Sequence, residues 1–356
     1  MGTHTTTHFR AHALDFLRIS LCAGVVLYHY TPDRPCIGPF MVIGFLVLSG
    51  FLLGLNFAQH NILDPTRFYA HKCKRFLPML TAVLFILFCL RLLLGHELVP
   101  PTNFEYGNFS IPLFLEWYNI PTWYMGVELL LLLAAPFFFF LHQSKGGIPT
   151  VCVGAALFSY FLFSRVPYEA PFGDGLYFSP IARCWQFMAG ILSAQILTGK
   201  YRSLAAHLPH FNIGSRTASA RQGGVATYLL LISYIFLWSL LAYLKQHSDL
   251  HYWNYTFFFD FLSTLFYACF IPCLYRTSLS LSMRCSSILS NTAALTYPIY
   301  LLHGPMLGYV LKILKHSGCY DSTLLSGMLS LICSIIGAII LTKLQKKLFS
   351  RVSATP

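Results

Sequence analysis

Residues 39–57 read PFMVIGFLVLSGFLLGLNF, an apolar run without a charged side chain. A hydrocarbon core about 30 Å thick requires about 20 such residues of helix to cross it. Because an open sheet cannot satisfy its backbone in lipid, the run predicts a helix. Similar runs recur along the chain. We therefore predict an all-α polytopic integral membrane protein with about ten transmembrane helices, at 14–31, 39–57, 76–95, 121–142, 149–165, 180–198, 225–245, 254–275, 292–315 and 322–343.

The composition of the whole chain agrees with this prediction. Of its 356 residues, 56% are hydrophobic and only 10% are charged, whereas a soluble domain carries about 25% charged residues. So little polar surface cannot cover a water-soluble globule of this size, which excludes a soluble enzyme, a disordered protein and a nucleic-acid binder. We expect one membrane-embedded domain over 1–356, with short cytoplasmic tails at 1–13 and 344–356, no cleavable signal peptide and no fused soluble domain.

The distribution of charge orients the predicted bundle. Basic residues gather in the connections on one side, as Arg67, Lys72, Lys74 and Arg75 do before the third span, and acidic residues such as Glu97 gather on the other. Cytoplasmic loops carry the excess of Lys and Arg, so this pattern places both termini in the cytoplasm. The net charge of +12 therefore indicates membrane orientation. We expect a bacterial inner (plasma) membrane.

The first span carries ionisable residues, which are costly in lipid and usually functional. Arg18 and His29 are eleven positions apart, almost three whole turns at 3.6 residues per turn, so they share one helix face with Asp15. The helical rise places His29 roughly 16 Å further toward the outside than Arg18. Asp15 and Arg18 are also spaced i, i+3, and a simple ion pair between them is the alternative interpretation.

Glu128 lies in the fourth span, which enters from the outside. Counting along a straight helix places it in the outer half with His29, so the two side chains are expected to share a cavity. A carboxylate beside an imidazole orients the ring and stabilises its charged form, an arrangement suited to general-base chemistry. Arg183 also enters from the outside, and a pair between Glu128 and Arg183 remains the alternative.

A basic cluster marks the cytoplasmic end of the third span. Lys72, Lys74 and Arg75 precede Pro78 there. Together with Arg18 they would form a basic mouth suited to phosphate groups. The alternative for each residue is a snorkelling side chain at the membrane interface.

The ninth span carries a polar face of its own. Tyr297, Tyr300 and His303 follow at i, i+3 and i+6 and are expected on one side of the helix. Pro298 and Pro305 should disturb the helix there, and irregular backbone at membrane depth is tolerated only around buried or wet cavities.

Small residues and cysteines indicate packing more than chemistry. Gly50 and Gly54 form a small-xxx-small pair, which predicts close helix packing. Cys36 and Cys319 fall in predicted outer loops, where they could form a disulfide in a periplasm. No cysteine or histidine spacing of the metal-binding kind occurs, so we expect no metal site.

Several blocks resemble one family. The segment LDFLR at 14–18, followed by His29, looks like the Arg-x10-His signature of the membrane acyltransferase type 3 family. Five further blocks follow in that family's order, from residue 14 to about 315 in all: Gly44–Leu52 (GFLVLSGFL), Lys72–Pro78 (KCKRFLP), Trp123–Glu128 (WYMGVE), Arg183–Gly190 (RCWQFMAG) and Tyr297–Pro305 (YPIYLLHGP).

The resemblance implies a reaction and the residues that perform it. An acyl group, most often acetyl, would move from cytoplasmic acyl-CoA (acetyl-CoA) to a hydroxyl of an extracytoplasmic carbohydrate or lipid-linked sugar, such as lipopolysaccharide O-antigen. No bound cofactor is implied. His29 would act as general base or acyl carrier and Glu128 would support it, while the donor phosphates would contact Arg18, Lys72 and Arg75. The acceptor or the cavity would involve Asp15, Trp123, Arg183, Tyr300 and His303.

The chain departs from the family pattern at three positions. Tyr124 and Gly126 stand where the family has serines, and Lys72 stands where arginine is usual, which loses bidentate phosphate geometry. Two other functions remain open, a secondary transporter and a non-catalytic membrane assembly protein. A transporter predicts an inverted repeat and a midplane site, whereas the buried charges here spread from the inner to the outer side, which suits two-sided transfer better.

Overall fold

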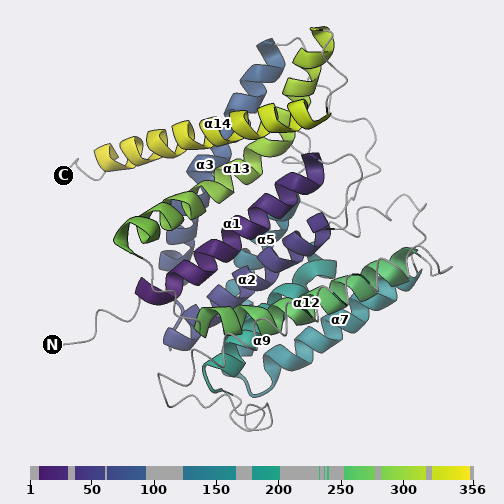
Figure 1. Ribbon diagram of the computed structural model, residues 1–356. Helices are drawn as coiled ribbons and strands as arrows, with labels where there is room; N and C mark the ends of the chain where they lie inside the picture. The colour runs from purple at the N-terminus through teal and green to yellow at the C-terminus, as the bar shows by residue number, and fades with distance from the viewer. Residues whose placement is uncertain are drawn as a thin grey trace.

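The computed structural model describes residues 8–30, 37–60, 62–93, 123–165, 179–200, 252–276, 282–317 and 323–352, together with Ile232, Phe236 and Ser239. All regular structure in these ranges is helical, which confirms the predicted all-α class for them (Figure 1). Cys36, Cys319 and nearly all of the predicted span 225–245 lie outside the described residues.

The predicted spans correspond to the observed helices. Every predicted span except 225–245 overlaps at least one of them. In chain order the helices are α1 (His8–Tyr30), α2 (Ile37–Gln59), α3 (Pro65–Leu93), α5 (Trp123–Leu133), α6 (Ala135–Gln143), α7 (Gly147–Arg165), α9 (Pro180–Leu197), α12 (Tyr252–Arg276), α13 (Met283–His316) and α14 (Thr323–Val352).

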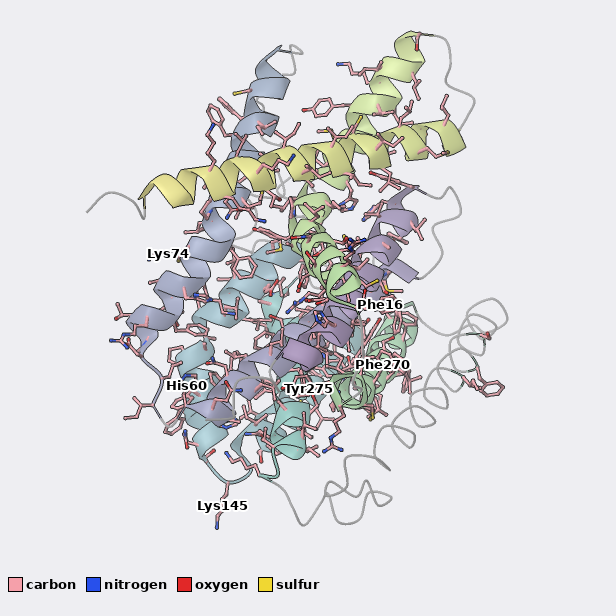
Figure 2. All side chains as sticks on the ribbon, turned by 60° about the vertical axis from the view of Figure 1, so that its left-hand side comes forward. Phe16, His60, Lys74, Lys145, Phe270 and Tyr275 are labelled. Carbon is pink, nitrogen blue, oxygen red and sulfur yellow. The ribbon has the colours of Figure 1, made fainter. Side chains whose placement is uncertain are left out.

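Five of the described helices are long and apolar enough to cross a membrane. They lie in α1, α2, α7, α12 and α14, and the bent pair α5–α6 passes the same test as one broken span. On α14, Ile332, Ile336 and Ile340 expose large apolar side chains, as a lipid-facing surface requires. Lys145 lies at the edge of the bundle, in the turn after α6 (Figure 2).

The fourth predicted span is a broken helix. The sequence predicts one helix over 121–142, but α5 and α6 meet at an angle of 51°. Pro136 lies in the first turn of α6, and its ring removes a backbone donor and blocks the preceding turn. The Tyr69 hydroxyl on α3 donates to the Leu133 carbonyl at this break, over 2.6 Å, which satisfies a backbone acceptor that a continuous helix would occupy.

The first helix occupies the middle of the bundle. It lies between α13 on one side and α2 on the other (Figure 1), and it contacts both. Leu21 on α1 belongs to one apolar core with Ile43 of α2 and Ile271 of α12. Cys22 and Val25, also on α1, belong to a second core with Leu301 of α13. Ionisable side chains on α1 are therefore held among protein helices.

Glycine allows α2 and α9 to approach closely, as the Gly50–Gly54 spacing predicts. A Cβ at Gly50 would collide with the Phe187 carbonyl of α9, and one at Gly54 would lie 3.0 Å from the Ile191 backbone. From the other side, a Cβ at Gly190 would collide with the Val47 carbonyl. The predicted close packing is confirmed, and it fixes α2 against α9.

Gly190→Ala should destabilise the protein because the added methyl meets backbone atoms that cannot rotate away. We expect a loss of about 1–3 kcal/mol, typical of overpacking, and a lower denaturation midpoint for the detergent-solubilised protein. Gly154→Ala on α7 is the matched control, since nothing lies within 4 Å of its new Cβ and alanine favours helix. Equal midpoints for the two variants would contradict the close contact between α2 and α9.

Candidate active site

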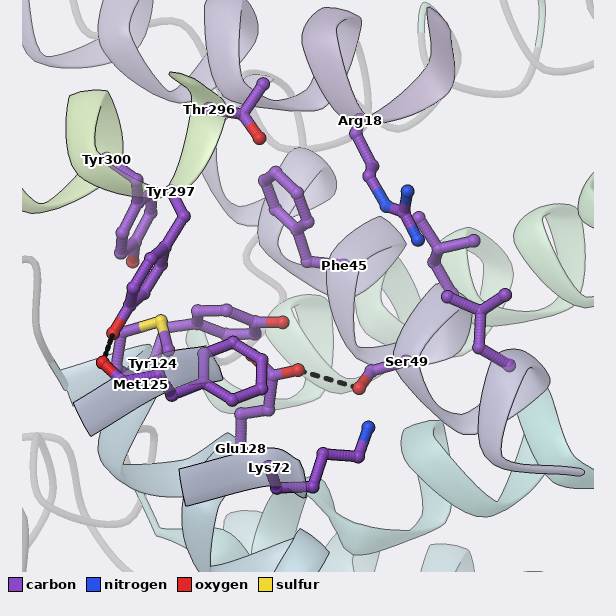
Figure 3. A pocket seen from close by; sticks show the side chains of 13 residues that line it. Arg18, Phe45, Ser49, Lys72, Tyr124, Met125, Glu128, Thr296, Tyr297 and Tyr300 are labelled. Carbon is purple, nitrogen blue, oxygen red and sulfur yellow. Dashed lines mark hydrogen bonds between the residues drawn. The ribbon is translucent and has the colours of Figure 1, made fainter. Parts of the chain in front are cut away.

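A cavity of about 120 Å³ lies among α1, α2, α3, α5 and α13. It is lined by apolar and aromatic side chains and by three ionisable ones: Arg18 of α1, Lys72 of α3 and Glu128 of α5. Figure 3 shows the Arg18 guanidinium and the Lys72 ammonium pointing into the same space as the Glu128 carboxylate. The fold therefore collects charges from three helices that are far apart in the sequence.

Glu128 is held by a serine of α2. The Ser49 hydroxyl donates to Glu128 Oε1 over 2.7 Å (Figure 3), and Glu128 is only 9% exposed. The sequence places Glu128 in the outer half beside His29, whereas the structure places it in the cavity that Arg18 and Lys72 line. Glu128 precedes the break between α5 and α6, so the break does not affect the helical count from residue 121. His29 does not line this cavity, so the predicted common cavity of Glu128 and His29 is not observed among the described residues. That Glu128 supports His29 stays a prediction.

Arg18 is anchored by its own helix. Its Nη1 donates to Asp15 Oδ1 over 2.8 Å, so the i, i+3 pair considered from the sequence is present. The Ser290 hydroxyl of α13 donates to Asp15 Oδ2 over 3.3 Å. The Arg18 side chain remains 25% exposed. This pair fixes the guanidinium at the cavity wall and leaves part of it accessible.

A second and larger cavity adjoins the first. It has a volume of about 480 Å³ and lies between α1, α3, α13 and α14. Arg18, Phe76, Thr296 and Tyr297 line both cavities, so the Arg18 side chain stands at their border. Lys346 on α14 lines only the larger one. A polar ligand in the larger cavity would therefore meet Arg18 before it reached Glu128.

His29 and Arg18 face the same helix, α13. The Cys22 thiol, between them on α1, donates to the Thr296 carbonyl of α13 over 3.4 Å. The His29 ring lies against His303 of α13, with ring centroids 5.1 Å apart. The predicted shared face of α1 is confirmed, and the His29 ring faces protein. His29 lines neither of the two cavities described above.

Aromatic residues of α13 connect the smaller cavity with His29. Tyr297 and Tyr300 line the cavity, and the Tyr300 ring lies 5.7 Å from Tyr124 and 5.5 Å from His303. The predicted common face of Tyr297, Tyr300 and His303 is therefore confirmed. It leads from the charged cavity to the two histidines.

The two prolines do not end α13. The helix runs from Met283 to His316 with Pro298 and Pro305 inside it. Figure 1 shows that α13 changes direction along its length, which agrees with the disturbance expected from the two prolines. Side chains of other helices bond to backbone carbonyls in this region, as Tyr30 does to His303 over 3.1 Å.

Arg183 pairs with Asp260, whereas the sequence left open a pair between Arg183 and Glu128. The Arg183 Nη1 donates to Asp260 Oδ2, joining α9 to α12, and both side chains are almost completely buried, with 2% and 1% exposed. Arg183 lines neither cavity. Sequence reasoning singled out Arg183 but did not pair it with Asp260, which lies within the predicted span 254–275. Their opposite charges in an apolar setting were the available signal.

Three further predicted site residues remain to be placed. Lys72 lines the smaller cavity, and its ammonium group also lies over the Phe68 ring, 5.5 Å from the ring centroid. Trp123 at the start of α5 is half-buried, and its ring lies 6.4 Å from that of Tyr124. The side chain of Arg75 lies outside the described part of the structure.

Within the described residues, no three His, Cys, Asp or Glu side chains gather closely enough to hold a metal ion.

Comparison with known proteins identifies the family. Residues 11–343 match the sequence profile of a family described as an acyltransferase domain, type 3. A comparison with curated proteins and one with solved structures find no match. The profile covers almost all of the 356 residues, including every block quoted from the sequence and every residue that lines the smaller cavity. The chain therefore belongs to the membrane acyltransferase type 3 family.

Proposed function

We propose that this membrane acyltransferase moves an acetyl group from cytoplasmic acetyl-CoA to a hydroxyl of an extracytoplasmic carbohydrate, such as lipopolysaccharide O-antigen. The proposal places the chain in a bacterial inner membrane with ten spans and both termini in the cytoplasm. The observation that carries it is the gathering of Arg18, Lys72 and Glu128 around one cavity, from which Tyr300 leads to His303 and His29.

Arg18 and Lys72 are proposed to bind the phosphate groups of the donor, together with Arg75. Three cations (Arg18, Lys72 and Lys346) and two carboxylates (Asp15 and Glu128) line the two cavities together, and the cation excess favours an anionic ligand. Arg18 is held in place by Asp15, so its guanidinium is pre-organised for charge-assisted hydrogen bonds. The larger cavity beside it provides room on the same side for the rest of the nucleotide.

His29 is proposed to act as the general base. It takes the proton from the acceptor hydroxyl as the hydroxyl oxygen attacks the thioester carbonyl carbon. A C–O bond forms, the C–S bond breaks, and the proton passes to the departing thiolate. The products are an O-acyl ester and free coenzyme A. The alternative, transient transfer of the acyl group to the imidazole, uses the same residue.

Glu128 is proposed to support this step from within the cavity. Its carboxylate, fixed by Ser49, lies on the wall toward which Lys72 points (Figure 3). In that position the Glu128 carboxylate orients the Lys72 ammonium group toward the donor. Because His29 lines neither cavity, Glu128 would support His29 through the bound substrates, which would connect the cavity with the His29 ring. Trp123, at the start of α5, is proposed to contact the acceptor sugar.

The decisive experiment compares envelope glycans from cells that express the chain with glycans from cells that lack it, by mass spectrometry. The proposal expects a mass increase of one acetyl group per modified sugar. The same cells receive isotope-labelled acetate, so that the label identifies the donated group. Unchanged glycans together with uptake of a labelled solute would favour a transporter and overturn the proposal.

A further inference from the structure

We propose that His303 is a positioning residue for His29, whose ring it orients by accepting a hydrogen bond at Nε2. This inference rests on the proposed function, in which His29 is the general base. Beyond that function, it assigns His303 as the partner that fixes which nitrogen of His29 faces the acceptor hydroxyl. The two rings lie next to each other, with centroids 5.1 Å apart and planes inclined by 46°.

The backbone determines the tautomer of His303. Its Nδ1 lies 2.6 Å from the Tyr300 carbonyl oxygen. A carbonyl oxygen can only accept, so Nδ1 carries the hydrogen of this bond. In a neutral imidazole the other ring nitrogen, Nε2, then carries a lone pair and is an acceptor. The local geometry of α13 therefore presents an acceptor at the tip of the side chain.

That acceptor has no hydrogen-bond partner within the described structure. His303 is 0% exposed, and its Nε2 makes no hydrogen bond there. A buried polar atom without a partner costs about 1–3 kcal/mol, which favours any donor that can reach it. The His29 ring is adjacent and half-buried. A small rotation of His29 about its Cβ–Cγ bond would direct an N–H at His303 Nε2.

Neighbouring residues hold His303 in place. The Tyr30 hydroxyl donates to the His303 carbonyl over 3.1 Å, and it lies 3.5 Å from the Ser334 hydroxyl of α14. The Tyr300 ring lies 5.5 Å from the His303 ring. His303 is thus fixed where α1, α13 and α14 meet, and its ring is suited to orient the half-buried ring beside it.

The consequence for the reaction concerns the orientation of His29. When one nitrogen of His29 donates to His303, the opposite nitrogen carries the lone pair and is available to take a proton. Without the acceptor at His303, the ring can present either nitrogen. Losing the hydrogen-bond partner that orients a metal-bound histidine costs about 10–100-fold, and we expect an effect of that order on kcat here.

Two variants separate this role from simple packing. His303→Gln retains a polar group near the Nε2 position, because the longer side chain brings its amide oxygen there. His303→Asn retains a donor near the Nδ1 position and has no atom near Nε2. We expect His303→Asn to lower kcat by about 10–100-fold at an unchanged KM for acetyl-CoA, and His303→Gln to restore most of the wild-type rate.

The measurement is the rate of acetyl transfer by protein in proteoliposomes, with denaturation midpoints recorded for each variant. Equal rates for the two variants, whether normal or reduced, would overturn the positioning role. A lower KM or higher KM with unchanged kcat in His303→Asn would also overturn it. Failure of the wild-type protein to transfer acetyl in the same assay would instead overturn the proposed function, so the two failures are distinguishable.

Discussion

His29→Ala is expected to reduce acetyl transfer by about 10²–10⁴-fold, the usual contribution of a positioned general base. The variant should still insert and fold, because His29 is only half-buried at the end of α1 and its ring belongs to neither apolar core. The rate is measured with labelled acetyl-CoA in proteoliposomes. Membrane insertion and the denaturation midpoint are measured on the same preparation.

His60→Ala is the matched control for this experiment. His60 follows α2 at the edge of the bundle, where its side chain is exposed (Figure 2), and its Nδ1 bonds to the Asn56 carbonyl over 2.9 Å. Its removal should leave transfer unchanged. Near-normal transfer by His29→Ala would remove His29 from the mechanism, and the role inferred for His303 would be lost with it.

Asp260→Ala is expected to produce the largest loss of stability. It removes the carboxylate that pairs with the buried guanidinium of Arg183, and breaking a buried ion pair costs about 3–5 kcal/mol. That corresponds to a factor of about 10²–10⁴ in the folding equilibrium. The denaturation midpoint of the detergent-solubilised protein should fall sharply, and the yield of folded protein should fall with it.

Two comparisons establish the cause of that loss. Arg67→Ala breaks the exposed pair with Asp64, in which the side chains are 91% and 52% exposed, and such pairs contribute about 0–1 kcal/mol. The double variant Arg183→Met with Asp260→Leu removes both charges and should recover much of the stability. A single variant Asp260→Ala as stable as Arg67→Ala would show that the buried pair does not hold α9 to α12.

Features that follow from helical periodicity could be predicted from the sequence. The common face of Arg18 and His29 is set by a spacing of nearly three whole turns, and both residues do lie against α13. The face of Tyr297 and Tyr300 follows from the same rule. The close approach at Gly50 follows from its missing side chain. Each of these depends on positions within a single helix.

The partners of a buried polar residue could not be predicted in this way. Counting along the helix gave Glu128 a position but no partner, and only the packing of α1, α3 and α5 around one cavity brings it together with Arg18 and Lys72. Ser49 lay in a block recognised as family-like, yet no role could be assigned to it. A neutral serine in an apolar run gives no signal until its neighbour is known.

The amino-acid sequence by itself determined a helical membrane protein of the acyltransferase type 3 family and the faces on which its polar residues lie. Only the tertiary structure decided that Glu128 bonds to Ser49, that Arg183 pairs with Asp260 and that His29 lies against His303. The reason is physical. Hydropathy and helical period are properties of one segment, whereas the partner of a buried polar group depends on which helices pack together and where they bend.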